Sequence, residues 1–325
     1  MKKKILLIAV LFMVTLLTGC GNKDKVVIYS PLEEERNKAL KEQLKEKFPD
    51  ITVDVQYIAT GNCAAKIKNE GSNIEADIVL ALAAPYMAAV SDNFADISNY
   101  DTSNYLEGIN NTKNYLIWEK YTMGIIIDKD YFEEHNLKKP TKYEDLLRPE
   151  YKGIIAMPDP KTSGTGYSFF LNAVNVMGED KAVEYFKKLK ENIREFTTSG
   201  SGTTNLLKQK EVAIAFGEVV QGVHGINEGY NFEIIELETG TPYDTSTYGI
   251  IKGKENKQNV QKVFEWLIKE FNKYDKEHFM PDKILKDQEI KIENFPTDLK
   301  DADMTDINSS ERKQELLKRW AEING

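Results

Sequence analysis

Cysteine and histidine are scarce in this chain of 325 residues, which holds two cysteines and three histidines. The histidines, at positions 135, 224 and 278, are far apart and lack the spacing of metal ligands. The sequence also contains no G-x-S-x-G elbow and no cluster of histidine with carboxylate residues. These absences argue against a hydrolytic or transferase enzyme, and neither a metal nor another cofactor is expected.

Positive charge is also in deficit. The formal net charge is −9, and it becomes −12 once Lys2, Lys3 and Lys4 are removed with the N-terminal segment considered below. An acidic balance of this size argues against nucleic acid as a partner. A bound anion would have to be held by local dipoles and positive side chains rather than by the overall field.

Long apolar runs are lacking apart from residues 5–17, which follow three lysines and precede Leu-Thr-Gly-Cys at positions 17–20. The run is too short to span a membrane, and the pattern is typical of a secretory signal peptide over residues 1–19. Its ending resembles a bacterial lipobox, which predicts diacylation of Cys20 and a polar tether over residues 20–25. Cys63 then has no partner for an intrachain disulfide.

Strand-like and helix-like segments alternate along the rest of the chain, which predicts an α/β fold with a largely parallel sheet. Residues 26–29, 51–57, 77–82, 118–127, 153–157, 212–217 and 232–237 are predicted strands. A helix is expected to open at Ser30, with Pro31 in its first turn. Residues 259–271 carry an amphipathic helical stripe, and a last helix is expected at about 310–323.

Small hydroxyl and glycine residues mark four strand-to-helix junctions. The most pronounced, residues 157–167, reads Met-Pro-Asp-Pro-Lys-Thr-Ser-Gly-Thr-Gly-Tyr. The unpaired N–H groups and the dipole of a helix start favour an anion. The alternative is ordinary helix capping with nothing bound. The candidate binding residues at these junctions are Ser30, Thr60, Gly61, Asn62, Ser163, Gly164, Thr165, Ser199, Gly200 and Ser201.

With these motifs in order, the chain resembles the solute-binding lipoproteins of bacterial ABC importers. The resemblance is to the type-2 periplasmic-binding-protein superfamily, in the branch for ferric iron, phosphonates and sugar phosphates. It rests on Ala-Asp-Ile-Val at 76–79, the 157–167 loop, Thr-Ser-Gly at 198–200, and residues 211–214, 238–243 and 259–266.

The resemblance implies two α/β lobes that close on a ligand by hinge motion. It implies a first lobe of residues 26–127 and 238–325, which includes the C-terminal helices, and a second lobe of 128–237. The hinge crossings are expected near 125–128 and 237–241. Tyr243, at the end of one matching segment, joins the candidate ligand-binding residues.

One departure from the family pattern concerns metal binding. Ferric-binding members carry two adjacent tyrosines after the strand that matches residues 212–216, whereas this chain reads Phe-Gly-Glu-Val at 216–219. Without that phenolate pair, direct capture of iron is not expected. Glu218 can instead face a positive group on the ligand, such as an amine, or be an exposed carboxylate at a strand end.

The leading hypothesis is therefore a non-catalytic, exported and membrane-anchored binding protein for a small anionic solute, either phosphorylated or a phosphonate. Its expected partners are an ABC permease and its ATPase, and it is expected to be a monomer. Ferric iron or a carboxylate as the ligand, or a ligand sensor built on the same fold, remain alternatives.

Overall fold

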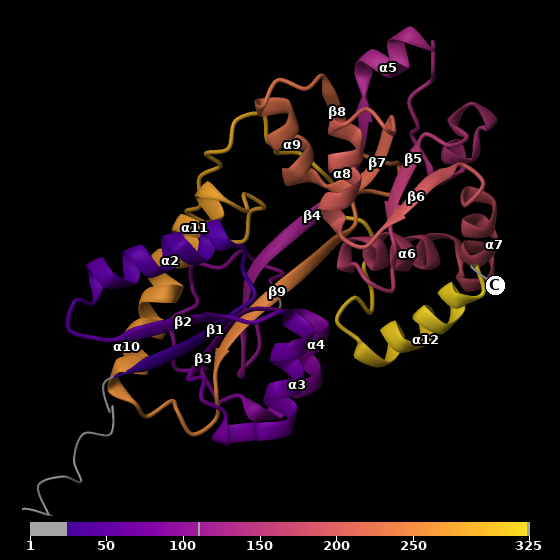
Figure 1. Cartoon of the computed structure of the whole chain (residues 1–325). Coiled ribbons are helices and arrows are strands. Elements are labelled where there is room, and N and C mark those ends of the chain that lie inside the picture. The colour runs from indigo at the N-terminus through magenta and orange to yellow at the C-terminus, as the bar shows by residue number, and fades with distance from the viewer. Residues whose placement is uncertain (1–24, 110, 324–325) are drawn as a thin grey trace, which may run out of the picture.

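The computed structural model describes residues 25–109 and 111–323, which form two α/β lobes (Figure 1). The expected signal peptide, Cys20 and all but the last residue of the expected tether lie outside the described residues. Within the described ranges, no helix is both long enough and apolar enough to cross a membrane.

The strands form a sheet that continues from one lobe into the other, in the order β2-β1-β3-β9-β4-β7-β5-β6, with β8 pairing with β4. Their bounds are β1 (Val26–Ser30), β2 (Val53–Tyr57), β3 (Ile78–Ala83), β4 (Leu116–Asp128), β5 (Ile155–Pro158), β6 (Ile193–Thr197), β7 (Ile214–Glu218), β8 (Phe232–Ile235) and β9 (Tyr243–Ile250).

Helices cover the faces of both halves of the sheet (Figure 1). Their bounds are α2 (Glu34–Lys47), α3 (Thr60–Glu70), α4 (Ala84–Val90), α5 (Lys129–Glu134), α6 (Gly164–Met177), α7 (Glu179–Leu189), α8 (Gly200–Lys208), α9 (Val219–Asn227), α10 (Gln258–Trp266), α11 (Asn272–His278) and α12 (Ser310–Ala321). A π-helical turn, Leu267–Phe271, joins α10 to α11.

The prediction of a largely parallel sheet is wrong. Parallel pairs join β1 with β2 and β3, and β5 with β6 and β7, whereas β3–β9 and the three pairs made by β4 are antiparallel. Antiparallel pairing arises because β4 and β9 cross between the lobes in opposite directions and are shared by both halves (Figure 1).

The crossing between lobes is made by these two strands. β4 pairs with β9 from Leu116 to Thr122 and then with β7 from Met123 onward. The N–H of Met123 donates to the carbonyl of Pro242 across 2.7 Å, which places the start of β9 beside the point where β4 changes partner. The change of partner thus lies before the expected 125–128, and the return lies just after the expected 237–241.

Each lobe has its own apolar core. In the first lobe, Val26, Ile28 and Ile78 of the strands pack with Val263, Phe264 and other residues of α10 and the π-helical turn. In the second lobe, Ile155, Phe170, Phe186 and Phe216 belong to one buried cluster. The continuous apolar runs of the buried strands produce this arrangement, since such strands are covered on both faces.

The C-terminal helix differs from the sequence expectation, which grouped it with the first lobe. Leu316 and Trp320 of α12 lie in the core cluster of the second lobe. The ring of Trp320 makes edge contacts with Phe170, Phe186 and Phe196 at centroid distances of 5.1, 5.3 and 5.8 Å. This aromatic cluster explains the placement, because burying a tryptophan removes a large apolar area from water.

Candidate functional site

A pocket of about 330 Å³ lies between the lobes and is lined from both sides. A pocket of this size suits a small solute. The first lobe contributes Pro31, Leu32, Glu33, Arg36, Thr60, Ala81, Ala83, Glu119, Tyr121, Ser246 and Met280. The second lobe contributes Thr162, Ser163, Gly164, Thr165, Thr198, Ser199, Gly200 and Glu218.

The first turn of α6 forms one wall of this pocket. Ser163 is the N-cap, as predicted, and its side chain accepts a hydrogen bond from the N–H of Gly166 across 3.4 Å. A Cβ atom at Gly166 would overlap the backbone of Pro158, with the carbonyl carbon only 2.8 Å away. Glycine is therefore needed there, because the strand end and the helix start approach each other closely.

A second contact joins this turn to Glu218 and to α8. The hydroxyl of Thr165 donates to Oε1 of Glu218 across 3.1 Å. A Cβ atom at Gly200 would lie 2.5 Å from Thr165 Oγ1 and 3.3 Å from Glu218 Oε1. The starts of α6 and α8 and the end of β7 therefore meet at one point, as expected for strand-to-helix junctions at one edge of a sheet.

Glu218 is half-buried at this point, and its pKa is raised to about 7. Desolvation is the main cause and the carboxylates of Glu33 and Glu119 add to it, whereas the hydrogen bond from Thr165 lowers the pKa. A carboxyl group with its pKa near neutrality in a cleft is typical of a functional position, although structural networks also produce such shifts.

Asp244 of β9 is the second buried carboxylate near α6. Its Oδ2 and the hydroxyl of Tyr121 lie 3.7 and 4.0 Å from where a Cβ atom of Gly164 would be. Burial raises the pKa of Asp244 to about 6, whereas its hydrogen bond from the backbone of Thr245 and the charge of Lys313 lower it.

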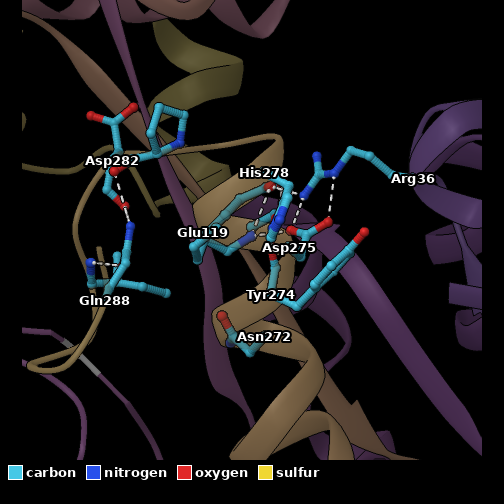
Figure 2. A network of polar contacts seen from close by, with 12 residues as sticks. Arg36, Glu119, Asn272, Tyr274, Asp275, His278, Asp282 and Gln288 are labelled. Atoms are coloured by element: carbon cyan, nitrogen blue, oxygen red, sulfur yellow. Dashed lines mark hydrogen bonds and ion pairs between the residues drawn. The ribbon is translucent and has the colours of Figure 1, made fainter. Parts of the chain in front are cut away.

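Arg36 is the cation of the pocket, and its guanidinium forms ion pairs with carboxylates of the protein itself. Its guanidinium donates to Asp275 at 2.9 and 2.6 Å and to Glu119 at 2.5 Å, and it contacts Glu33 at 3.2 Å. Figure 2 shows Arg36 reaching the carboxylate of Asp275 in α11, with Glu119 beside it. Although burial opposes ionisation, the charges of Arg36 and Lys276 hold the pKa of Glu119 below its usual value.

The charge of the pocket follows from these pairs. Among the described residues that line it, Glu33, Glu119 and Glu218 are acidic and Arg36 is the single cation. Any phosphoryl group bound here would therefore rely on helix N–H groups and hydroxyls, and the acidic excess favours a positive group elsewhere on the solute.

The structure brings together seven of the predicted site residues as pocket lining: Thr60, Ser163, Gly164, Thr165, Ser199, Gly200 and Glu218. Gly61, Asn62 and Ser201 lie beside the lining residues without lining the pocket themselves. Helix α3 begins at Thr60 and helix α8 at Gly200, and neither has a side-chain cap.

The prediction that Ser30 caps a helix is wrong. Ser30 is the fully buried last residue of β1, paired with Tyr57, and α2 begins only at Glu34. The parallel ladder with β2 continues through Ser30, so the helix starts later in the chain, with Glu33 as its N-cap. Its hydroxyl instead accepts a hydrogen bond from the N–H of Leu32 across 3.3 Å.

Tyr243 does not line this pocket. It borders a larger cavity of about 770 Å³ formed with the segment 301–309, where the ammonium group of Lys120 lies 4.7 Å from its ring centroid. Sequence reasoning missed Glu33, Arg36, Glu119 and Tyr121. Arg36 lies in the first turn of the first helix after a strand and Glu33 is the N-cap of that helix, and this position was the available signal for them.

No group of three or more histidine, cysteine, aspartate or glutamate residues placed to hold a metal ion occurs in residues 25–109 and 111–323.

The family model for bacterial extracellular solute-binding proteins matches residues 30–272 of this chain, and the chain belongs to this family. An uncharacterised protein of Haemophilus influenzae is 23% identical over 269 residues, which are 77% of this chain and 75% of that protein. Membership makes the chain an extracellular solute-binding protein of the kind that serves ABC importers.

Solved structures of periplasmic binding proteins share the two-lobe fold, which confirms the predicted fold class. The protein AfuA from Actinobacillus pleuropneumoniae, solved with fructose-6-phosphate, matches with a TM-score of 0.76 and 21% identity over 92% of this chain and 98% of its own. The apo ferric ion-binding protein A of Pasteurella haemolytica matches with a TM-score of 0.77 and 18% identity over 93% and 98%.

Proposed function

We propose that the chain captures a small phosphorylated or phosphonate solute in the pocket between its lobes and delivers it to an ABC permease driven by an ATPase. The observation that carries this proposal is the meeting of the α6 and α8 starts at Thr165 and Gly200. Two helix N-termini directed at one point supply N–H donors and partial positive charge. A solute that carries a phosphoryl group fits those donors.

Glu218 extends the proposal to the other end of the solute. Its half-buried carboxylate lies beside the proposed phosphoryl position, so a fully anionic solute would meet a like charge once Glu218 is ionised. A solute with an amine in addition to its phosphoryl group would pair with that carboxylate instead. The proposed solute is therefore an amine-bearing phosphonate or phosphate ester.

The test is calorimetric titration at pH 8 with inorganic phosphate, ethylphosphonate, 2-aminoethylphosphonate, fructose-6-phosphate and ferric citrate as probes. The expected result is binding of the phosphoryl compounds, with the amine-bearing phosphonate bound more tightly than ethylphosphonate. Binding of ferric citrate alone would contradict the proposal.

A variant tests the loop directly. Each charge-assisted hydrogen bond to a buried anion contributes about 1.5–3 kcal/mol, so Ser163→Ala with Thr165→Val should weaken binding by roughly two to four decades. Ser201→Ala is the matched control, because this hydroxyl lies in the first turn of α8 without lining the pocket. Thermal melts of the apo proteins verify folding, since loss of one cap costs only about 1 kcal/mol. Unchanged affinity in a folded double variant would make the loop a simple helix cap.

Membrane anchoring through Cys20 is part of the same proposal. Two acyl chains give stable attachment, which a single chain does not. Cys20→Ala should release the protein into the soluble fraction of cells. Retention of this variant in the membrane fraction would contradict anchoring by the lipobox cysteine.

A further inference from the structure

Helix α12 is attached firmly to the second lobe. Besides the aromatic contacts of its ring, the Nε1–H of Trp320 donates to Oδ1 of Asp159 across 3.0 Å. Arg319 adds ion pairs to Glu179 at 2.9 Å and to Asp180 at 2.6 Å, both at the start of α7. The helix therefore moves with the second lobe whenever the lobes move.

Lys313, in the N-terminal half of α12, reaches the first lobe. The ammonium nitrogen of Lys313 lies 4.8 Å from the ring centroid of Tyr167 and 5.5 Å from that of Tyr86. Tyr167 belongs to α6 in the second lobe, and Tyr86 belongs to α4, which follows the pocket residue Ala83 in the first lobe. Figure 1 shows α12 beside both α4 and α6.

We propose that Lys313 is a latch between the lobes, a cation shared by Tyr86 and Tyr167 that stabilises the arrangement in which both lobes enclose the pocket. Both distances are within the range in which a cation is attracted to an aromatic face. When the lobes separate about β4 and β9, Tyr86 moves with the first lobe and Lys313 with the second. The contact between Lys313 and Tyr86 is then lost. This contact therefore stabilises the closed arrangement relative to the open one.

The surroundings of Lys313 agree with this role. Burial lowers the pKa of Lys313, and the charge of Asp244 raises it. Asp244 lies beside Gly164, which lines the pocket, so Lys313 interacts with a carboxylate close to the ligand site. A partly desolvated cation interacts with aromatic faces more strongly than one in water.

The state of closure sets the affinity that a solute experiences, because the apparent dissociation constant rises as the competent fraction falls. A cation–π contact of ordinary strength corresponds to about a three- to tenfold change in the ratio of closed to open molecules. Lys313 is thus a positioning residue, which acts on binding without contacting the solute.

The experiment measures the distance between the lobes in the ligand-free protein. Spin labels are attached through Lys68→Cys on α3 and Lys188→Cys on α7, both exposed positions, in a background with Cys20→Ser. Cys63 is buried and is expected to stay unlabelled. Pulsed electron–electron double resonance then reports the populations of short and long distances between the two spin labels.

Lys313→Met keeps the apolar stem and removes the charge, so the ratio of the long-distance to the short-distance population should grow three- to tenfold. Tyr86→Leu should produce the same change, and Lys313→Arg should restore the wild-type distribution. Lys318→Met, an exposed position on the same helix, should leave the distribution unchanged. A wild-type distribution in Lys313→Met, or an equal change in Lys318→Met, would overturn the latch.

Discussion

Thr165 and Glu218 are joined by a hydrogen bond of 3.1 Å in which the hydroxyl donates to Oε1 of the carboxyl group. The pair connects the first turn of α6 to the end of β7, and both residues line the pocket between the lobes. It therefore links the proposed phosphoryl position to the group that would meet a positive charge on the solute.

The raised pKa of Glu218 predicts a pH-dependent cost of folding. The folded-state pKa of about 7 exceeds the ordinary value of 4.5, so the folded protein binds more protons between these values. Stability from protonated Glu218 is complete below pH 4.5 and is lost as the pH rises through 7. The cost at pH 8 is at most about 3 kcal/mol, at 1.36 kcal/mol per pKa unit.

Glu218→Gln removes this titration while keeping an acceptor for Thr165. Its melting temperature should exceed that of the wild type at pH 8 by more than at pH 5. Glu46→Gln on the exposed side of α2 is the control and should show no such pH-dependent difference. Equal melting-temperature differences at both pH values would show that Glu218 is already solvated in the folded protein.

Arg36 provides a second prediction, because its removal would leave Glu119 and Asp275 buried without their main partner. Breaking a buried ion pair from one side costs about 3–5 kcal/mol. Arg36→Leu should lower the free energy of unfolding in urea by that amount. Lys47→Leu is the matched control, because its pair with Glu270 is exposed and contributes at most about 1 kcal/mol. A loss below 1 kcal/mol for Arg36→Leu would mean that water replaces the guanidinium.

The sequence predicted the elements whose signal is local. Residues 26–29 and 212–217 are mostly apolar runs, and they correspond to β1 (Val26–Ser30) and β7 (Ile214–Glu218). The capping serine at position 163 and the glycine at 166 follow from junction chemistry within a few residues. The prediction of a helix start at Ser30 was wrong because the strand continues through that residue. Its ladder with β2 is a contact with a distant segment of the chain.

The charged part of the site could not be predicted from the sequence for the same reason. Arg36 pairs with Glu119 and Asp275, which are 83 and 239 positions away. Each of the three residues lies in a charged helix or an ordinary strand, where charge normally indicates a solvated face. Only the tertiary fold places them together, and this determines that the pocket offers a solute no unpaired cation among its described lining residues.

Gly166 gives a prediction about the loop backbone. A Cβ atom there would overlap Pro158, whereas a Cβ atom at Gly61 would have no neighbour within 4 Å. Gly166→Ala should destabilise the protein by about 1–3 kcal/mol and weaken binding of the phosphonate probes. Gly61→Ala, near the start of α3, should be neutral or slightly stabilising. Denaturant unfolding of both variants makes the comparison, and equal effects would show that the loop backbone adjusts without cost.

Iron binding is the last prediction. The segment 216–219 lacks the tyrosine pair that ferric-binding members carry, and no metal-binding cluster occurs among residues 25–109 and 111–323. Tyr121 is the single phenol among the described residues that line the pocket, and burial raises its pKa well above the ordinary value of 10. One phenol that resists ionisation is a poor ligand for a hard trivalent cation. Titration with ferric citrate should therefore produce no phenolate-to-iron charge-transfer band. A stoichiometric band that disappears in Tyr121→Phe would place iron in this pocket and would remove the basis for a phosphoryl solute.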